Sequence, residues 1–173
     1  MIRRRRLAVA PLLVVAALTL GTVAATPALR GPPWISIEYP VNPYDRDARD
    51  AFLVVHTFHH QQPVGFPVSG RAEGLVQGKR RTVTLSFGTT SKDGVYTLTR
   101  QWPADGTWLL VIQTSQGASD GSTVTAMVTL DSDGAVAGVR VPTERKNNYT
   151  MPSAVTAADV EAALSRGAIR VSR

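Results

Sequence analysis

Residues 94–112 read GVYTLTRQWPADGTWLLVI, and this stretch decides the fold that the sequence predicts. Apolar and polar residues alternate through residues 95–100, and an apolar run resumes at residues 108–112. Between them, Pro103 cannot donate a hydrogen bond to a strand ladder, and Asp105-Gly106 suits a turn with positive φ. The pattern predicts a β-hairpin whose tryptophan and tyrosine side chains supply apolar area for a sandwich core.

Further strand patterns lie on both sides of this hairpin. The sequence predicts strands over residues 34–39, 51–60, 71–77, 80–87, 123–130 and 135–141. Asp-Gly pairs mark turns at regular intervals, at residues 93–94, 105–106, 120–121 and 133–134. Short strands separated by turns at this spacing are typical of an all-β fold. We therefore expect an immunoglobulin-like antiparallel β-sandwich of about eight strands over residues 34–142.

The C-terminal extension, residues 143–173, has a different character. Residues 143–152 are polar and predict an irregular connection. Thr156 and Asp159 then have the spacing of a capping box, which predicts a short helix over residues 157–166 with Gly167 just past its end. Because a helix of about ten residues is too short to be stable alone, we expect it to dock on the sandwich. A short strand is expected over residues 168–171.

The N-terminal segment, residues 1–25, has the organisation of a signal peptide. Arg3, Arg4, Arg5 and Arg6 are followed by an apolar stretch over residues 7–20 and by the small residues Ala24 and Ala25. Cleavage after Ala25 leaves residues 26–33 as a flexible leader. The alternative is an uncleaved anchor, since residues 7–25 are just long enough to span a bilayer. Both readings place the folded part outside the cytoplasm, in the periplasm or secreted, with the membrane involved only through an uncleaved segment.

The charge of the chain argues against a nucleic-acid partner. The formal net charge is +6, from 19 basic and 13 acidic residues. Four of the 19 are the arginines of the N-terminal segment, so the remaining chain carries only 15 basic residues against 13 acidic ones. Such a balance lacks the strong positive field that nucleic-acid binding needs. The chain has no cysteine, which removes disulfides, thiol catalysis and cysteine metal ligands.

Three histidines form the one cluster in the sequence that suggests a transition metal. His56, His59 and His60 fall on the strand predicted over residues 51–60, and histidine outside the cytoplasm suits copper or zinc. An extended strand would, however, separate His56 from His60 by about 13 Å and turn His59 and His60 to opposite faces unless a bulge intervenes. A shared site over these three residues therefore needs an irregular backbone.

The sequence offers no catalytic constellation. The Gly-x-Ser-x-Gly nucleophile motif is absent from the chain. The stretch Asp131-Ser132-Asp133-Gly134 begins like a calcium loop, but the later ligands of that loop are missing, so it predicts a hairpin turn. We expect no catalytic residue and no bound cofactor, with copper or zinc as the alternative.

A resemblance rests on the stretch PVSGRAEG at residues 67–74, Gly94-Val95-Tyr96, Trp102-Pro103 and Gly106-Thr107-Trp108. This pattern resembles the YtkA-like and FixH-like extracytoplasmic domains and, more loosely, transthyretin-like sandwiches. The resemblance covers residues 51–113. It implies an immunoglobulin-like sandwich that is exported or membrane-tethered and has no enzymatic activity. Some relatives in this family are linked to copper handling or oxidase assembly.

Together these observations predict a non-enzymatic binding module of the cell envelope. Its partner is expected to be another envelope protein or a component of the cell surface. In a sandwich, binding residues lie on the loops at the ends of the sheets, here residues 61–70 and 115–122. The alternative is a copper- or zinc-binding accessory protein that uses His56, His59 and His60.

Overall fold

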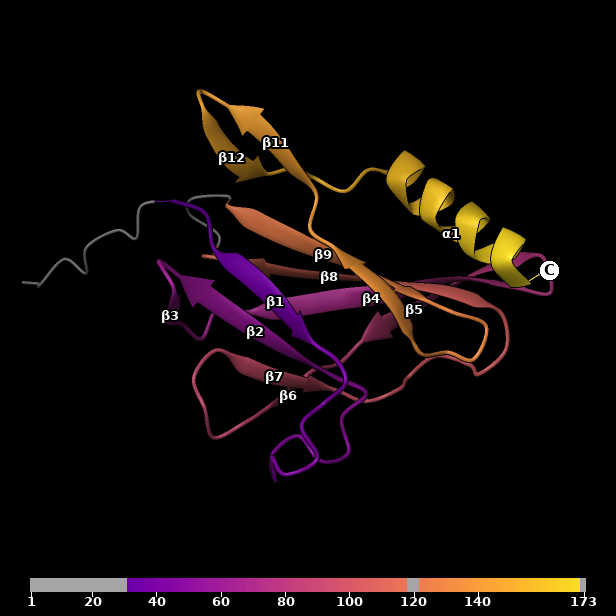
Figure 1. Cartoon of the computed structure of the whole chain (residues 1–173), viewed down its shortest axis with the longest axis horizontal. Coiled ribbons are helices and arrows are strands. Elements are labelled where there is room, and N and C mark those ends of the chain that lie inside the picture. Colours follow the sequence, from indigo (N-terminus) through magenta and orange to yellow (C-terminus); the bar gives the residue numbers. More distant parts are fainter. Residues whose placement is uncertain (1–30, 118–121, 172–173) are drawn as a thin grey trace, which may run out of the picture.

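The computed structural model describes residues 31–117 and 122–171 (Figure 1). The predicted signal peptide at residues 1–25, most of the predicted leader, and part of the loop at residues 115–122 lie outside the described residues. The described residues form twelve strands, of which β3 and β6 have only two residues each, and one helix.

Two antiparallel sheets make up the body of the molecule. The first, sheet A, has the strand order β1-β2-β7-β6, with β3 paired to the end of β2. Its strands are β1 (Trp34–Glu38), β2 (Leu53–His59), β3 (Gln62–Pro63), β6 (Gly88–Thr89) and β7 (Val95–Leu98). The second, sheet B, has the order β10-β9-β8-β4-β5. Its strands are β4 (Val68–Val76), β5 (Lys79–Leu85), β8 (Thr107–Ser115), β9 (Thr123–Leu130) and β10 (Val136–Arg140).

The main core lies between the two sheets. Alternate residues of the central strands point into it, because successive side chains of a strand face opposite sides. Sheet A contributes Leu53, Val55 and Leu98, and sheet B contributes Leu110 and Ile112 among others, all fully buried. The all-β sandwich expected from the sequence is therefore confirmed.

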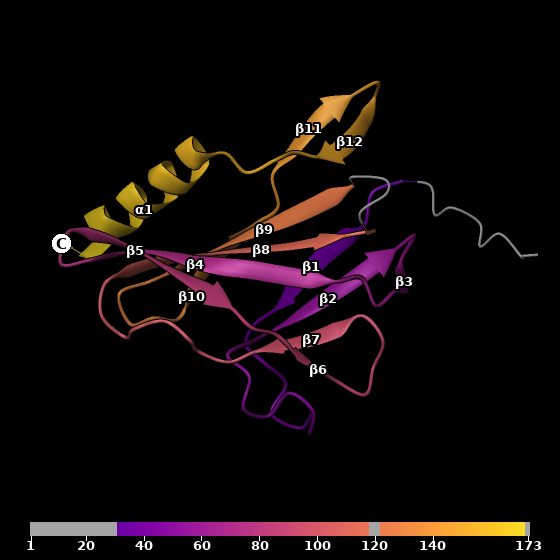
Figure 2. The same ribbon diagram turned by 180° about the vertical axis from the view of Figure 1, so that it is seen from behind.

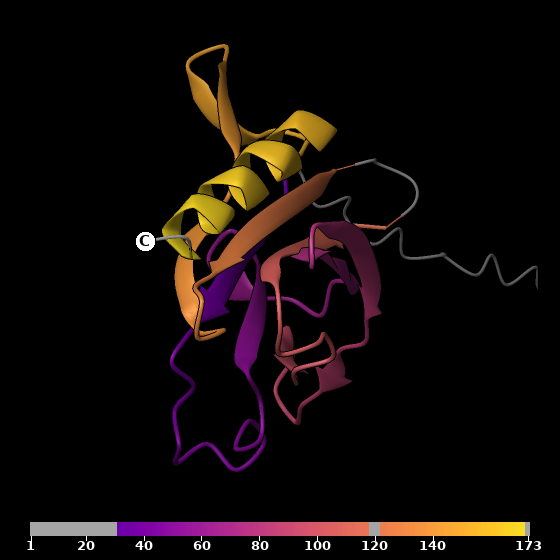
Figure 3. The same ribbon diagram turned by 90° about the vertical axis from the view of Figure 1, so that its right-hand side faces the viewer.

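The second face of sheet B is covered by the helix α1 (Ala157–Val171). Figures 1 and 3 show α1 on the side of sheet B that faces away from sheet A. A second, smaller core joins helix and sheet, made of Val160, Ala163 and Leu164 with Leu109, Val111 and Met127. The predicted docking of the helix is confirmed. Within the described ranges, no helix has both the length and the apolar character needed to cross a membrane.

The start of α1 follows the sequence prediction and its end does not. The backbone N–H of Asp159 donates to the Thr156 hydroxyl at 3.2 Å, and the Thr156 N–H donates back to the Asp159 carboxylate at 3.0 Å, which is the predicted capping box. The prediction that the helix stops at residue 166 is wrong, as is the strand expected over residues 168–171, because the helix continues to Val171. Gly167 lies inside the helix, where a Cβ atom would come within 2.6 Å of Thr107. This glycine lets the helix approach the sheet instead of ending it.

The hairpin predicted over residues 94–112 is wrong. β7 pairs with β2 and β6 in sheet A, whereas β8 pairs with β4 and β9 in sheet B. The segment between them crosses from one sheet to the other, and Gly106, with φ of 92°, immediately precedes β8 without closing a hairpin. The prediction that these aromatic residues feed the core is confirmed, since Trp102 and Trp108 are both buried in it.

The polar segment predicted to be irregular is also ordered. It forms a separate two-stranded ribbon of β11 (Thr143–Lys146) and β12 (Tyr149–Pro152) that stands away from the body in Figures 1 and 3. Asn147 and Asn148, with φ of 49° and 65°, make its tight turn. The same device closes the β4–β5 hairpin, seen from behind in Figure 2, at Gln77-Gly78 with φ of 50° and 75°. That turn lies one residue earlier than the sequence suggests.

Gly74 tests how tightly the core is packed. A Cβ atom on Gly74 would meet the Trp108 ring at 2.5 Å, whereas one on Gly138, another strand glycine, would have its nearest neighbour at 3.4 Å. We expect Gly74→Ala to lower the free energy of unfolding by about 1–3 kcal/mol, because the indole must move from its packed position. Gly138→Ala, measured beside it by urea denaturation, should be neutral or slightly stabilising. Equal effects of the two changes would contradict this packing.

Asp159 should show an unusually acidic titration. The hydrogen bonds from the Thr156 hydroxyl and N–H, with one from Arg140, lower the pKa of this carboxyl from 3.8 to about 2. Because the pKa is lower in the folded chain, the ionised carboxylate stabilises the fold above pH 3.8, and this contribution is lost as the pH falls toward 2. The carboxyl carbon shift followed by NMR should titrate near the lower value. Thr156→Ala should move the midpoint upward, and an unchanged midpoint would contradict the capping geometry.

Candidate functional site

His56 lies on the outer face of sheet A, paired with a carboxylate. Its Nε2 atom is 2.9 Å from the Oε2 atom of Glu38 on the neighbouring strand β1. The two residues are diagonal neighbours on one sheet face, since His56 is directly opposite Ser36. The hydrogen bond with His56 is the main reason that the pKa of Glu38 lies below its ordinary value. This pair joins β1 to β2 at a half-buried position.

His59 and His60 lie together at the far end of the same strand. His60 and Gln61, with φ of 48° and 66°, form a tight turn from β2 into β3. The turn brings the rings of His59 and His60 to a centroid distance of 4.1 Å with an interplanar angle of 26°. His59 is buried and lies edge-on to Phe66. The irregularity that the sequence analysis required is therefore present, but it joins only two of the three histidines.

The three histidines do not converge on one point. Strand alternation places His56 on the outer face of sheet A and His59 on the inner face. The stacked rings of His59 and His60 hold their lone pairs in nearly parallel planes, which is unsuited to two bonds of about 2 Å to a single ion. In the described part of the chain, no group of three or more metal-binding side chains is arranged around an ion site. The copper or zinc hypothesis stays a prediction that requires the β2–β3 turn to rearrange.

The segment predicted as the first binding loop, residues 61–70, is only partly a loop, because it contains β3 and the first three residues of β4. Hydrogen bonds hold the part between these strands. The Thr57 hydroxyl donates to the carbonyl of Val64, and the Tyr96 hydroxyl donates to that of Phe66 at 2.7 Å. Burial raises the pKa of Tyr96 above its ordinary value, so the phenol is protonated and can donate over an even wider pH range than a free tyrosine. This loop is therefore held firmly against sheet A. In the second loop, residues 118–121 lie outside the described residues.

The turn at residues 131–134 is a hairpin turn, as predicted. The Oδ1 atom of Asp131 accepts the backbone N–H groups of Asp133 at 3.0 Å and Ala135 at 2.8 Å. A carboxylate oxygen used in this way closes the turn between β9 and β10. The turn also borders the first of two surfaces that the sequence analysis did not find.

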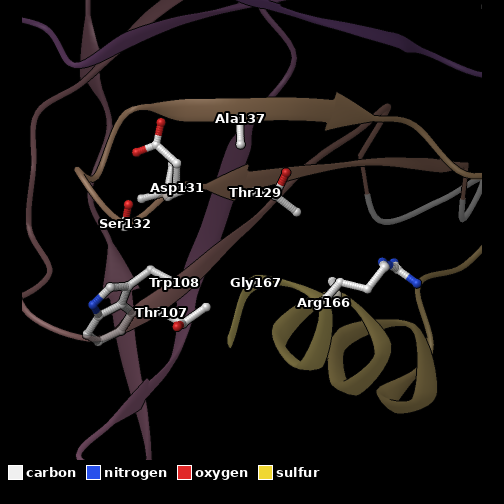
Figure 4. A pocket seen from close by; sticks show the side chains of 10 residues that line it. Thr107, Trp108, Thr129, Asp131, Ser132, Ala137, Arg166 and Gly167 are labelled. Atoms are coloured by element: carbon white, nitrogen blue, oxygen red, sulfur yellow. The ribbon is translucent and has the colours of Figure 1, made fainter. Parts of the chain in front are cut away.

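This first surface is a cleft of about 470 Å³ between α1 and the β9–β10 hairpin (Figure 4). Thr107 and Trp108 line it from the start of β8, and Leu130 lines it from the end of β9. In Figure 4 the helix, with Arg166 and Gly167, faces the two strands of the hairpin across the gap. The cleft is formed by segments that are far apart in the sequence, so no local sequence motif predicts it.

The second surface is the β11–β12 ribbon. Every residue from Thr143 to Thr150 is exposed, and the side chain of Tyr149 is 72% exposed. Because both faces of the ribbon meet water, its sequence lacks the apolar alternation that identifies a half-buried strand. The signal that could have located it is the Asn147-Asn148 pair, since asparagine tolerates the positive φ of a tight hairpin turn.

Comparisons with protein-family models, with curated proteins and with solved structures found no match for this chain. The resemblance to YtkA-like and FixH-like domains, and the export of the chain, therefore stay predictions.

The geometry of the histidines predicts the result of a metal titration. Calorimetry with Cu(I), Cu(II) and Zn(II) should show no 1:1 binding tighter than about micromolar, because no three ligands face one point. A variant with His56, His59 and His60 all changed to alanine should behave like the unaltered protein. Tight 1:1 binding that this variant loses would contradict the arrangement described and support the metal-binding hypothesis.

Proposed function

We propose that this chain is an exported, non-enzymatic binding module of the cell envelope that contacts a protein partner through the β11–β12 ribbon. The observation that carries the proposal is the ribbon itself, an ordered pair of strands that leaves the body of the sandwich and stands in solvent (Figures 1 and 3). Export is supported by the sequence of residues 1–25, which has the three regions of a signal peptide.

The ribbon is built to hold one shape. Its register runs without interruption from Thr143 opposite Pro152 to Lys146 opposite Tyr149. At its base the N–H of Ser153 donates to the carbonyl of Pro142 at 3.0 Å, which continues the pairing toward the body. A contact surface that is ordered before binding loses less conformational entropy when the partner arrives. This order favours a role in recognition over a role as a flexible connection.

One face of the ribbon has the residue types of an interface. Lys146 and Tyr149 form one cross-strand pair, and Glu144 and Met151 form another on the same face. Tyrosine and methionine are enriched at protein interfaces, and exposed tyrosine can bury a large amphipathic surface without losing much rotamer freedom. The sandwich and helix cores are complete without this face. We infer that Tyr149 is the central contact of the face.

Site-specific photo-crosslinking tests the proposal in cells that produce the protein. A photoreactive phenylalanine derivative would replace Tyr149, and in a matched control it would replace Tyr44, whose side chain is even more exposed at 92%. Tyr44 lies in the loop at residues 40–51, away from the ribbon in Figure 1. We expect a discrete protein adduct from position 149 alone. The same adducts from both positions, or none from position 149, would contradict the proposal.

Once the partner is identified, Tyr149→Ala measures the energy of this contact. The dissociation constant should rise by about 30-fold, which corresponds to the loss of about 2 kcal/mol typical of a central aromatic contact. The free energy of unfolding should stay unchanged, because the side chain is exposed in the free protein. Tyr44→Ala should change neither quantity.

A further inference from the structure

We propose that the cleft between α1 and the β9–β10 hairpin binds a small monocarboxylate with an apolar body, such as a medium-chain fatty acid. This inference concerns a different surface from the ribbon and does not rest on the proposed function. The cleft volume of about 470 Å³ lies in the range of sites that hold small molecules.

Arg166 of α1 is a cation at this cleft that no described carboxylate neutralises. Asp159 pairs with Arg140 of β10 at 3.1 Å, and Glu161 pairs with Arg80 of β5 at 3.1 Å. Arg166 lines the cleft and makes no ion pair with any described residue. It lies seven residues after Asp159, so both side chains project from the same side of the helix, toward the β9–β10 hairpin. An uncompensated guanidinium at a cleft attracts an anionic group.

The shape of that cation favours a carboxylate. A guanidinium presents two parallel N–H groups that match the two oxygens of a carboxylate. Arg166 is the one cationic side chain among the described residues that line the cleft, so a singly charged group is matched better there than a doubly charged phosphate. Asp131 lies at another part of the wall, well separated from Arg166 in Figure 4. Its negative charge disfavours a second anionic group there.

Much of the remaining wall suits an apolar body, although the hydroxyl side chains of Thr107 and Ser132 also line the cleft. Trp108, Leu130 and Ala163 line the cleft with largely buried carbon surfaces. The indole N–H of Trp108 donates to the carbonyl of Asp105 at 2.8 Å, and the Thr129 hydroxyl donates to the carbonyl of Gly138 at 3.2 Å. Because these two donors already have hydrogen-bond acceptors within the protein, they do not need an acceptor from a ligand. A hydrocarbon chain can therefore lie along this floor with its carboxylate at Arg166.

Three probes separate the parts of the proposal, with the purified protein observed by NMR. Octanoate carries both the charge and the chain, octanamide carries the chain alone, and acetate carries the charge alone. We expect octanoate to shift resonances of cleft residues and to bind more tightly than octanamide, and acetate to show no saturable binding. Octanoate that shifts no cleft resonance at millimolar concentration, or that binds no better than octanamide, would overturn the proposal.

Two cleft variants and one control assign the effect to named side chains. Arg166→Gln should weaken octanoate binding by about tenfold or more and leave octanamide unchanged, because it removes a charged hydrogen-bond donor. Ala137→Phe, at an exposed position of the cleft wall, should weaken both ligands by filling the space. Arg145→Gln on the ribbon removes an equal charge elsewhere and should change neither affinity. Arg166→Lys keeps the charge but lacks the two parallel N–H donors, so it should give an intermediate affinity. Octanoate binding that is unchanged in Arg166→Gln would refute the assignment.

Discussion

The structure depends on β8 and β9, the two strands of sheet B that are buried on both faces. In β8, Leu110 and Ile112 point into the core between the sheets, while Leu109 and Val111 point to the opposite side. An antiparallel sheet commonly leaves one face in water, but apolar residues on both faces of its central strands require a second cover. Helix α1 supplies that cover, and the order sheet A, sheet B, helix follows from it. The cleft is a consequence of the same arrangement, because a single helix cannot cover the whole outer face of sheet B.

The sequence predicted which residues form β7 and β8 and which of their side chains are buried better than it predicted the strands with which they pair. Alternation in β7 and the apolar run in β8 were both interpreted correctly, and Trp102 and Trp108 are core residues as expected. The predicted pairing of β7 with β8 was wrong because a periodic pattern indicates which face of a strand is buried but does not indicate which strand lies next to it. A turn residue such as Gly106 serves a connection between sheets as well as a hairpin, so local chemistry does not distinguish the two.

Two further errors have simple physical causes. Gly167 was interpreted as a helix cap, but the absence of a Cβ atom is needed there for contact with Thr107 of β8. A glycine required for close approach looks the same in sequence as one required for positive φ. The ribbon was missed because its strands bury neither face, and burial is what creates the apolar alternation that sequence analysis detects. The cleft therefore depends on tertiary geometry that the sequence expresses weakly, whereas the ribbon is a local hairpin whose only sequence signal is its turn at Asn147 and Asn148.

The turn at His60 and Gln61 determines how the three histidines lie relative to one another. On a regular strand His59 and His60 would point to opposite faces, and the turn at His60 and Gln61 supplies the irregular backbone that brings their rings together. The same turn leaves His56 on the other face of β2, hydrogen-bonded to Glu38. Residue type suggested a cluster of three, whereas the strand geometry divides it into a pair and a single residue. Metal chemistry at these residues thus depends on a movement of the backbone.

Native-state hydrogen exchange tests most directly the claim that β8 and β9 hold the structure while the ribbon stands apart. Amides of β8 and β9 lie between two covered faces, so they should exchange only through global unfolding. Amides paired between β11 and β12 should exchange through local opening, at a much lower free energy that is independent of denaturant. Exchange of β8 or β9 through local opening, or ribbon amides that are as protected as those strands, would contradict the account.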